Sequence, residues 1–399
     1  MKRDPQKAPI RSDQHVGHYD VILAGGGAAG LSLAYHLSLA RPGLSMLIID
    51  EAVKDRNDHT WCFWSPEPSY LDDLAYRIWD RLLVVSESET LNLNLAPYRY
   101  RMVRALDFYR FMRSHLARLP NVHFRHGTVQ TIADGPDRAE VLVNALTFTG
   151  DWVFDSRYRS SAYRPLGTNH HYLVQHFLGW EIESATPVFD PQTPTFFDFR
   201  TPQHGVMRFV YVLPYSETRG MVEYTLFSAS LLPRADYEMA LRRYLKTVLK
   251  VETYRILDEE QDLIPMTDHV TPRRAGHRVL NIGTRGGRVK ASSGYAFSRI
   301  DRDSAAIVRS LTSQGHPFDL PTPPRRYHTF DAMLLHILEQ QGHLAQSIFM
   351  QLFIRNPVQR VLRFLDEEGG LGENLQLMAS VPPVPFLKAW LATKFVRGI

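Results

Sequence analysis

The chain of 399 residues contains one cysteine, Cys62, and has no long uninterrupted apolar run. A single cysteine excludes an internal disulfide and a cysteine-based metal site, which suits a reducing compartment. We interpret Cys62 as a buried, inert thiol. A membrane-spanning helix needs roughly 20 consecutive apolar residues, but four glycines interrupt the most apolar window, residues 21–40. The sequence therefore predicts no membrane span.

Neither sign of charge is in large excess, because 46 lysines and arginines nearly balance 42 aspartates and glutamates. The net charge of +4 is too weak to predict a nucleic-acid partner, although it is compatible with an anionic membrane surface. Residues 1–18 are polar and have no apolar core, so we expect a disordered tail and no signal peptide. These features favour a cytoplasmic protein that is attached peripherally to the inner membrane.

The sequence lacks the motifs of two common enzyme classes, the P-loop nucleotide hydrolases and the serine hydrolases. The chain has no Walker loop and no G-x-S-x-G nucleophile motif. His170 and His171 are adjacent and cannot face one metal as an i, i+4 pair would, so we predict no metal site. The acidic run DEEQD, residues 258–262, precedes an apolar strand-like segment and is interpreted as a solvated charge run.

The first structured segment of the sequence is residues 19–51, whose pattern predicts a strand, a glycine turn, a helix and a second strand. The apolar run 21–24 is typical of a parallel strand that is buried on both faces. Residues 31–39 keep a helical spacing until Pro42 and Gly43 end it. The pattern predicts a βαβ unit.

Gly25, Gly27 and Gly30 form the motif G-x-G-x-x-G between that strand and helix. The first glycine permits a tight turn, the second lets the backbone approach a pyrophosphate, and the third allows close helix–strand packing. Asp50 ends the second strand about 20 residues later, where a carboxylate can hold a ribose hydroxyl. The motif predicts dinucleotide binding, and the alternative is a tight turn without a ligand.

A second glycine-rich loop, within residues 280–297, resembles the loop that returns to the flavin in flavoproteins of the hydroxylase and reductase type. The resemblance implies FAD, and not NAD, with loop contacts from Gly283, Thr284, Gly287, Gly294 and Tyr295. Those flavoproteins usually have Asp where Thr284 stands. Arg104 lies where they often place an arginine near the cofactor, and the alternative is a solvated arginine at a helix start.

Strand-like and helical segments divide the chain into parts. We expect an α/β, Rossmann-type flavoprotein fold of the hydroxylase or geranylgeranyl reductase kind, with a discontinuous FAD-binding domain at 19–160 and 265–320. Residues 161–264 are β-rich, with a predicted hairpin over 208–228, and are assigned to a substrate-binding domain. After a proline-rich boundary, residues 321–399 are expected to form a helical C-terminal region.

Three motifs lie outside the glycine loops: NDHTWCFWS at 57–65, a Leu-Pro-x-Ser strand end at 213–216 before Glu223, and NPVQRVLRFLDEE at 356–368. With the loops, they resemble the bacterial lycopene β-cyclases from Tyr19 almost to the C-terminus. The sequence departs from that family at Tyr224, where many members have a second acid. It departs again at Ala291, where the family has proline.

This resemblance implies an isomerase that closes the ends of lycopene into β-rings, giving β-carotene through γ-carotene. It implies lycopene and related carotenes as substrates. The family binds FAD and needs it reduced, although the reaction has no net redox change, and NAD(P)H is the expected reductant of the flavin.

Ring closure by protonation of a double bond requires a desolvated general acid. Strand alternation along MVEYTLFS puts Glu223 on one face with three uncharged side chains: Met221, Thr225 and Phe227. A lone acid on such a face is costly unless it is used or paired, and burial keeps it protonated near neutral pH. We therefore predict that Glu223 is the general acid.

Asp198, in TFFDFR, is a second candidate. It either relays the proton or holds Glu223 in place, or it forms an ion pair with Arg200 or Arg208. Ring closure also creates a tertiary carbocation, which π-faces can stabilise. Trp61, Phe63 and Trp64 either supply those faces and line a polyene channel or pack in the core.

The C-terminal segment, residues 382–399, combines Phe386, Trp390 and Phe395 with basic residues. It is interpreted as an amphipathic helix that either lies on a bilayer or packs onto the protein.

Two other functions compete with cyclisation. A flavin-dependent isoprenoid oxidoreductase, like geranylgeranyl reductase or an epoxidase, would change the mass of its substrate. A non-catalytic prenyl-binding protein would carry no flavin and would not depend on Glu223.

Overall fold

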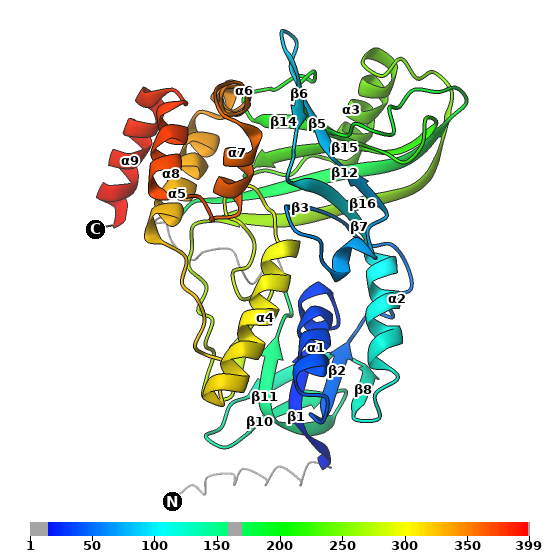
Figure 1. Ribbon diagram of the computed structural model, residues 1–399, viewed down its shortest axis with the longest axis vertical. Coiled ribbons are helices and arrows are strands. Elements are labelled where there is room, and N and C mark those ends of the chain that lie inside the picture. The colour runs from blue at the N-terminus through cyan, green and yellow to red at the C-terminus, as the bar shows by residue number, and fades with distance from the viewer. Residues whose placement is uncertain (1–14, 159–169, 398–399) are drawn as a thin grey trace, which may run out of the picture.

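The computed structural model describes residues 15–158 and 170–397 and places an α/β part, a large second sheet and a group of C-terminal helices together (Figure 1). Residues 1–14 of the expected N-terminal tail lie outside the described residues. The expectation was wrong for residues 15–18, because they begin the first strand and pair with β11. Backbone pairing with a strand more than a hundred residues away is not visible in the local sequence.

The first sheet has the strand order β8-β2-β1-β11-β10-β9, with β17 beside β11. Pairing is parallel along β8, β2, β1, β11 and β17, and antiparallel at β9 and β10. The strands are β1 (His15–Ala24), β2 (Met46–Asp50), β8 (Val122–His126), β9 (Val129–Ala133), β10 (Ala139–Val143), β11 (Leu146–Asp155) and β17 (Val279–Asn281).

Three helices pack with this sheet around one apolar cluster: α1 (Ala28–Ala40), α2 (Ala105–Leu116) and α4 (Phe297–Gln314). The residues of β1 from Val21 to Ala24 are buried, as expected for a strand covered on both faces. The predicted βαβ unit is confirmed, and the turn between β1 and α1 holds the G-x-G-x-x-G motif.

The second sheet has the order β16-β12-β15-β14-β13-β5-β6. Its strands are β5 (Arg81–Val85), β6 (Thr90–Asn94), β12 (Tyr172–Ser184), β13 (Thr195–Asp198), β14 (Met207–Pro214), β15 (Arg219–Ser228) and β16 (Tyr254–Thr267). The predicted hairpin is confirmed, since β14 and β15 pair antiparallel up to Pro214 and Gly220. Helix α3 (Arg234–Thr247) packs on one face of this sheet, and the other face borders a pocket.

A small third sheet, β3-β7-β4, lies between the two large sheets (Figure 1). It consists of β3 (Thr60–Ser65), β4 (Arg77–Trp79) and β7 (Arg99–Arg104), with the short helix η1 (Tyr70–Asp72) before β4. The aromatic stretch NDHTWCFWS therefore forms β3 and the loop before it.

The expected domain division differs from sheet membership in two places. Strands β5 and β6 belong to the second sheet, although residues 19–160 were assigned to the FAD-binding part. The expected boundary between residues 264 and 265 falls inside β16. Both differences come from pairing between segments far apart in the chain, such as β5 with β13, which local patterns do not reveal.

The C-terminal part is helical, as predicted. It contains α5 (Arg325–Gln340), η3 (Gly342–Leu344), α6 (Ala345–Arg355), α7 (Val358–Leu365), α8 (Leu371–Ala379) and α9 (Pro383–Arg397). Phe386 is buried and Trp390 packs against the cluster of α5 and α6, so these two aromatics face the protein. The side chain of Phe395 lies outside the described residues. No helix in 15–158 or 170–397 is both long and apolar enough to cross a bilayer.

Candidate active site

A pocket of about 870 Å³ extends from the first glycine turn to the pocket face of the second sheet. Gly25, Gly27 and Asp50 line one end, and Tyr211 and Glu223 line the other. One continuous space thus joins the predicted dinucleotide site to the predicted acid.

The glycine turn is shaped for a ligand at Gly27. A Cβ atom on Gly25 would lie 2.1 Å from the Ser156 hydroxyl, and one on Gly30 would lie 1.9 Å from the Gly25 carbonyl oxygen. These two glycines are therefore needed for the fold itself. A Cβ on Gly27 would meet nothing within 4 Å, which leaves open space at the start of α1, where a phosphate can bind.

Asp50 closes this end of the pocket. Its Oδ2 accepts a hydrogen bond from the Gly26 amide at 2.6 Å, which ties the end of β2 to the glycine turn. The carboxylate also borders the pocket, so it is placed to accept a further bond from a ribose hydroxyl.

The second glycine loop approaches the same space. Gly283 has a φ of +60°, and a Cβ there would lie 2.7 Å from the Ala29 Cβ, so the loop sits directly against the start of α1. Thr284, Gly294 and Tyr295 line the pocket with Gly283, whereas Gly287 is not among the lining residues. Four of the five loop residues predicted from the sequence are thus brought to the pocket.

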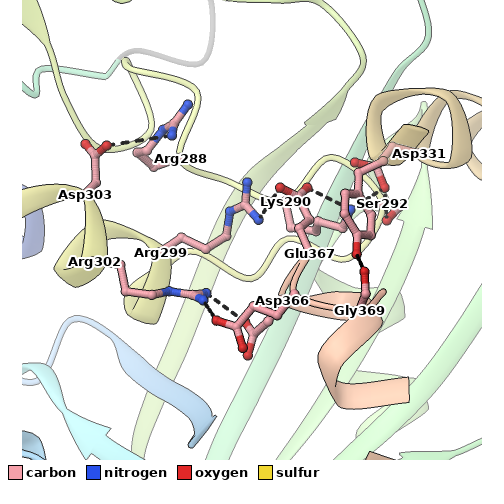
Figure 2. A network of polar contacts seen from close by, with 12 residues as sticks. Arg288, Lys290, Ser292, Arg299, Arg302, Asp303, Asp331, Asp366, Glu367 and Gly369 are labelled. Carbon is pink, nitrogen blue, oxygen red and sulfur yellow. Dashed lines mark hydrogen bonds and ion pairs between the residues drawn. The ribbon is translucent and has the colours of Figure 1, made fainter. Parts of the chain in front are cut away.

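An ionic network fixes this loop to the C-terminal helices (Figure 2). The fully buried ammonium of Lys290 lies 2.6 Å from Asp331 of α5 and 3.0 Å from Glu367 after α7. Glu367 also pairs with Arg299 of α4 at 3.2 Å. Since the Lys290 amide donates to the Tyr295 carbonyl at 2.8 Å, the network holds the segment that carries Tyr295.

Glu223 lies at the sheet end of the pocket. Strand pairing puts it opposite Tyr211 of β14 and Gly179 of β12, on the pocket face. Its Oε1 accepts a hydrogen bond from the Thr225 hydroxyl at 2.7 Å, and no cation pairs with it among the residues that the structure describes. Burial, and then the negative charge of Glu260, raise the pKa of Glu223 to about 8. The side chain is therefore a protonated acid at neutral pH.

Three phenols line the pocket together with this acid: Tyr100, Tyr211 and Tyr295. Burial raises the pKa of each well above its ordinary value, so all three stay neutral. Cys62 lies among them, and burial raises the pKa of its thiol to about 12, which keeps it protonated. Sequence reasoning missed Tyr100 and Tyr211, although their positions in RYRMVR and FVYVLP have the alternation of strands.

The aromatic stretch has divided roles. Trp61 lines the pocket and stacks on Phe297 with ring centres 4.8 Å apart. Phe63 and Trp64 are buried in apolar clusters and do not belong to the pocket lining, which agrees with the core-packing alternative. The residues before Trp61 contact acids of β16: the Thr60 amide donates to Glu260 at 3.0 Å, and His59 Nδ1 lies 3.5 Å from Asp262.

Glu260 and Asp262 are pocket residues that sequence reasoning missed. The interpretation of DEEQD as a solvated charge run holds for the exposed Asp258 and Glu259, but it was wrong for these two. Glu260 is only 6% exposed, and burial raises its pKa to about 7. Strand alternation turns Glu260 and Asp262 inward on either side of the exposed Gln261, and this period of two was the available clue.

Asp198 and Arg104 are not brought to the pocket. Asp198 lies on the α3 face of the second sheet, where it accepts hydrogen bonds from Arg200 at 2.5 Å and from Tyr244 of α3 at 2.6 Å. Its predicted proton relay to Glu223 is therefore corrected, and the alternative of an ion pair with Arg200 is the one observed. Arg104 precedes α2 and pairs with Asp107 at 2.7 Å, as a helix-start arginine does.

Comparisons with known proteins agree with this architecture. The geranylgeranyl bacteriochlorophyll reductase-like protein of Thermoplasma acidophilum superimposes with a TM-score of 0.61 at 12% identity, covering 93% of this chain and 98% of that chain. This likeness confirms the predicted mixed α/β flavoprotein fold with a helical C-terminal part.

Relatives in sequence indicate the family. A lycopene beta-cyclase of Pantoea ananas is 27% identical over 395 residues, covering 93% of this chain and 97% of the relative. A chloroplastic neoxanthin synthase of Solanum tuberosum is 24% identical, covering 70% of this chain and 58% of the relative. The family model described as lycopene cyclase protein matches residues 20–391. Because this match spans nearly the whole sequence, the chain belongs to the lycopene cyclase protein family.

Proposed function

We propose that the protein is a lycopene β-cyclase that closes the ends of lycopene into β-rings and gives β-carotene through γ-carotene. The observation that carries this proposal is Glu223, a half-buried acid in the pocket lining whose pKa is raised to about 8 and which has no ion pair among the described residues. It faces a pocket that continues to a dinucleotide cradle. Protonating an isolated double bond requires such an acid.

In the proposed reaction, Glu223 donates its proton to the terminal double bond of lycopene. The tertiary carbocation that results is attacked by a neighbouring double bond, which forms the ring, and a proton then leaves the ring. The neutral rings of Tyr100, Tyr211 and Tyr295 present π-faces to the cation, and their burial keeps water away from it. A carbocation exposed to water would be trapped as an alcohol.

FAD fits the residues of the other end of the pocket. The open space above Gly27 suits the pyrophosphate and Asp50 suits the ribose. Four buried polar atoms of lining residues have no hydrogen-bond partner among the described residues, as a polar ligand would require: Thr60 Oγ1, Gln175 Oε1, Glu260 Oε2 and Ser293 Oγ. Reduced FAD would supply an electron-rich ring that can stabilise positive charge, and NAD(P)H is the proposed source of its electrons.

The lipid-soluble substrate favours a peripheral position on the cytoplasmic side of the inner membrane. Helix α9 lies at the outer edge of the C-terminal helices (Figure 1), and its outward residues are apolar and basic: Val384, Leu387, Lys388 and Leu391. We propose this face as the membrane contact, in place of the aromatic face that the sequence suggested.

Expression in a lycopene-accumulating host tests the proposed function, with pigments separated by chromatography and identified by mass. We expect β-carotene and γ-carotene, both isomers of lycopene. In an anaerobic assay, rings should form with reduced flavin while no NAD(P)H is consumed per ring. One equivalent of reductant per product, or a product of changed mass, would instead assign an isoprenoid oxidoreductase.

A further inference from the structure

Three neighbouring strands place two glutamates on the same face of the sheet, one on each side of a glycine. In the antiparallel register, Gly179 of β12 is opposite Glu223 of β15 on one side and opposite Glu260 of β16 on the other. Residues directly opposite one another in antiparallel strands share a face of the sheet. Their backbones are therefore two strand spacings apart, about 10 Å, and both carboxyl groups face the pocket.

The glycine keeps the space between these carboxyl groups open. A Cβ atom on Gly179 would lie 3.4 Å from Cβ and Cγ of Glu223 and 3.0 Å from the sulfur of Met221. Gly179 is not in the left-handed region, so its conformation does not require glycine. The space is thus the evident reason for a residue without a side chain in the middle of a strand.

One carboxylate oxygen of Glu260 accepts a hydrogen bond, and the other has no partner in the part of the chain that the structure describes. Its Oε1 accepts the hydrogen bond of the Thr60 amide at 3.0 Å, whereas Oε2 is buried and has no partner among the described residues. No lysine, arginine or histidine pairs with Glu260 within the described ranges, because the nearby His59 and Lys54 pair with Asp262 and Asp58. A buried carboxylate oxygen without a partner is costly unless a ligand or a proton uses it.

Electrostatics make the two glutamates a pair that shares protons. The charge of Glu260 raises the pKa of Glu223, so ionisation of both at once is disfavoured. The other titratable groups that face them, besides the three pocket tyrosines, are Asp58, His59, Cys62, Tyr109, Tyr215 and Asp262. Burial raises the pKa of both carboxyl groups, so the resting pair keeps a proton at neutral pH.

We propose that Glu260 is the base that takes the proton leaving the new ring, as the partner of the acid Glu223. This inference rests on the proposed cyclase function. The O–H bond of Glu223 breaks as a C–H bond forms at the end of lycopene, and the neighbouring π electrons form the ring C–C bond. A ring C–H bond then breaks, its electrons restore a double bond, and its proton goes to Glu260.

Protons and electrons balance over this sequence. The pair of glutamates begins and ends with one proton, which has moved from Glu223 to Glu260, and nothing is oxidised or reduced. Return of that proton across the gap beside Gly179 restores the starting state. The enzyme is then ready for the second end of the substrate.

Cyclisation in D₂O tests the inference, with lycopene in phosphatidylcholine vesicles and FAD kept reduced under anaerobic conditions. Glu260→Gln keeps an acceptor for the Thr60 amide but removes the base. Ring formation should fall about 10²-fold or more, while recovered lycopene gains deuterium, because Glu223 still protonates the substrate and the cation reverts. Glu223→Gln should give neither rings nor deuterated lycopene.

Glu259→Gln is the matched control, since Glu259 is the preceding residue, points to the opposite face and pairs with Arg234 at 2.6 Å. It should cyclise like the wild type. Wild-type rates in Glu260→Gln, or lost cyclisation with bound FAD and unlabelled lycopene, would overturn the role of Glu260 as base. If Glu260→Gln does not fold, Gly179→Ala is the second test, because it narrows the gap between the carboxyl groups and keeps both acids. Slowed cyclisation with deuterium-labelled lycopene would support the pairing of Glu223 with Glu260. A wild-type rate would overturn it.

The proposed function itself fails separately, if the wild type forms no rings. If the wild type cyclises and Glu223→Gln does not, a wild-type rate in Glu260→Gln rejects only the assignment of the base.

Discussion

Glu223 and Asp198 are carboxylic acids of the same sheet that lie on opposite faces and have opposite surroundings. Asp198 is 0% exposed and accepts hydrogen bonds from Arg200 and Tyr244. Glu223 is contacted by one hydroxyl, that of Thr225, and otherwise faces a pocket with Glu260 across from it. The face under α3 therefore neutralises a carboxylate with a cation, whereas the pocket face keeps an acid protonated.

This difference indicates a structural role for Asp198 and a catalytic role for Glu223. A paired carboxylate is a structural group, because its charge is already compensated by hydrogen bonds and a cation. An unpaired, desolvated acid gains nothing for the fold but holds a proton that it can donate. Removing the first should therefore affect folding, and removing the second should affect turnover.

The largest expected effect is on turnover. Glu223→Gln keeps the size of the side chain and removes the acidic proton, so ring formation should fall about 10²–10⁴-fold. FAD content and thermal stability should match or exceed those of the wild type, because a buried amide costs less than a buried charge. Ring formation per bound FAD is the measurement, and a wild-type value would show that Glu223 is not the acid.

The next effect concerns the glycine-turn end of the pocket. Gly27→Val fills the open space at the start of α1 and should leave the purified protein without FAD, measured by its absorbance. Gly43→Val is the matched control, since a Cβ there also meets nothing within 4 Å and Gly43 lies outside the pocket lining. Full flavin content in Gly27→Val would place the pyrophosphate elsewhere.

The paired acid should behave in the opposite way. Asp198→Ala leaves the buried Tyr244 hydroxyl without its acceptor, which should reduce the free energy of unfolding by about 1–3 kcal/mol. Well below the melting temperature, ring formation per bound FAD should stay near the wild-type value. Loss of turnover at unchanged stability, measured by denaturant unfolding, would return a catalytic role to Asp198.

The last expected effect is a dependence of stability on pH. The folded-state pKa of Glu223 is raised from the ordinary 4.5 to about 8, so the folded protein keeps a proton that the unfolded chain releases. The stabilisation is complete below about pH 4.5 and is lost as the pH rises through about 8. Glu223→Gln should lose less stability than the wild type over this window, and parallel melting curves would contradict the raised pKa.

Local sequence patterns predicted the parts of this molecule that depend on short-range geometry. The glycine turn, the βαβ unit and the β14–β15 hairpin follow from spacing and turn chemistry within a few tens of residues. The orientation of Glu223 with Met221, Thr225 and Phe227 follows from strand alternation alone. The resemblance of motifs predicted the family, which the match over residues 20–391 confirmed.

Other features depended on long-range pairing and could not be predicted from local patterns. Alternation indicates which residues of a strand share a face, but it does not say what covers that face. Asp198 and Glu223 therefore looked alike in sequence, and only the packing of α3 distinguished them. Glu260 looked like surface charge until β16 paired with β12.

The sequence by itself determined the cradle, the strand that carries the acid and the family, because these are encoded in contiguous residues with fixed spacing. The tertiary structure decided which carboxylates meet. Glu223 and Glu260 are 37 positions apart in the chain and face one pocket only because β12 places Gly179 between their strands. The pKa of each acid depends on how far the surrounding strands and helices exclude water from it, so packing decided their protonation.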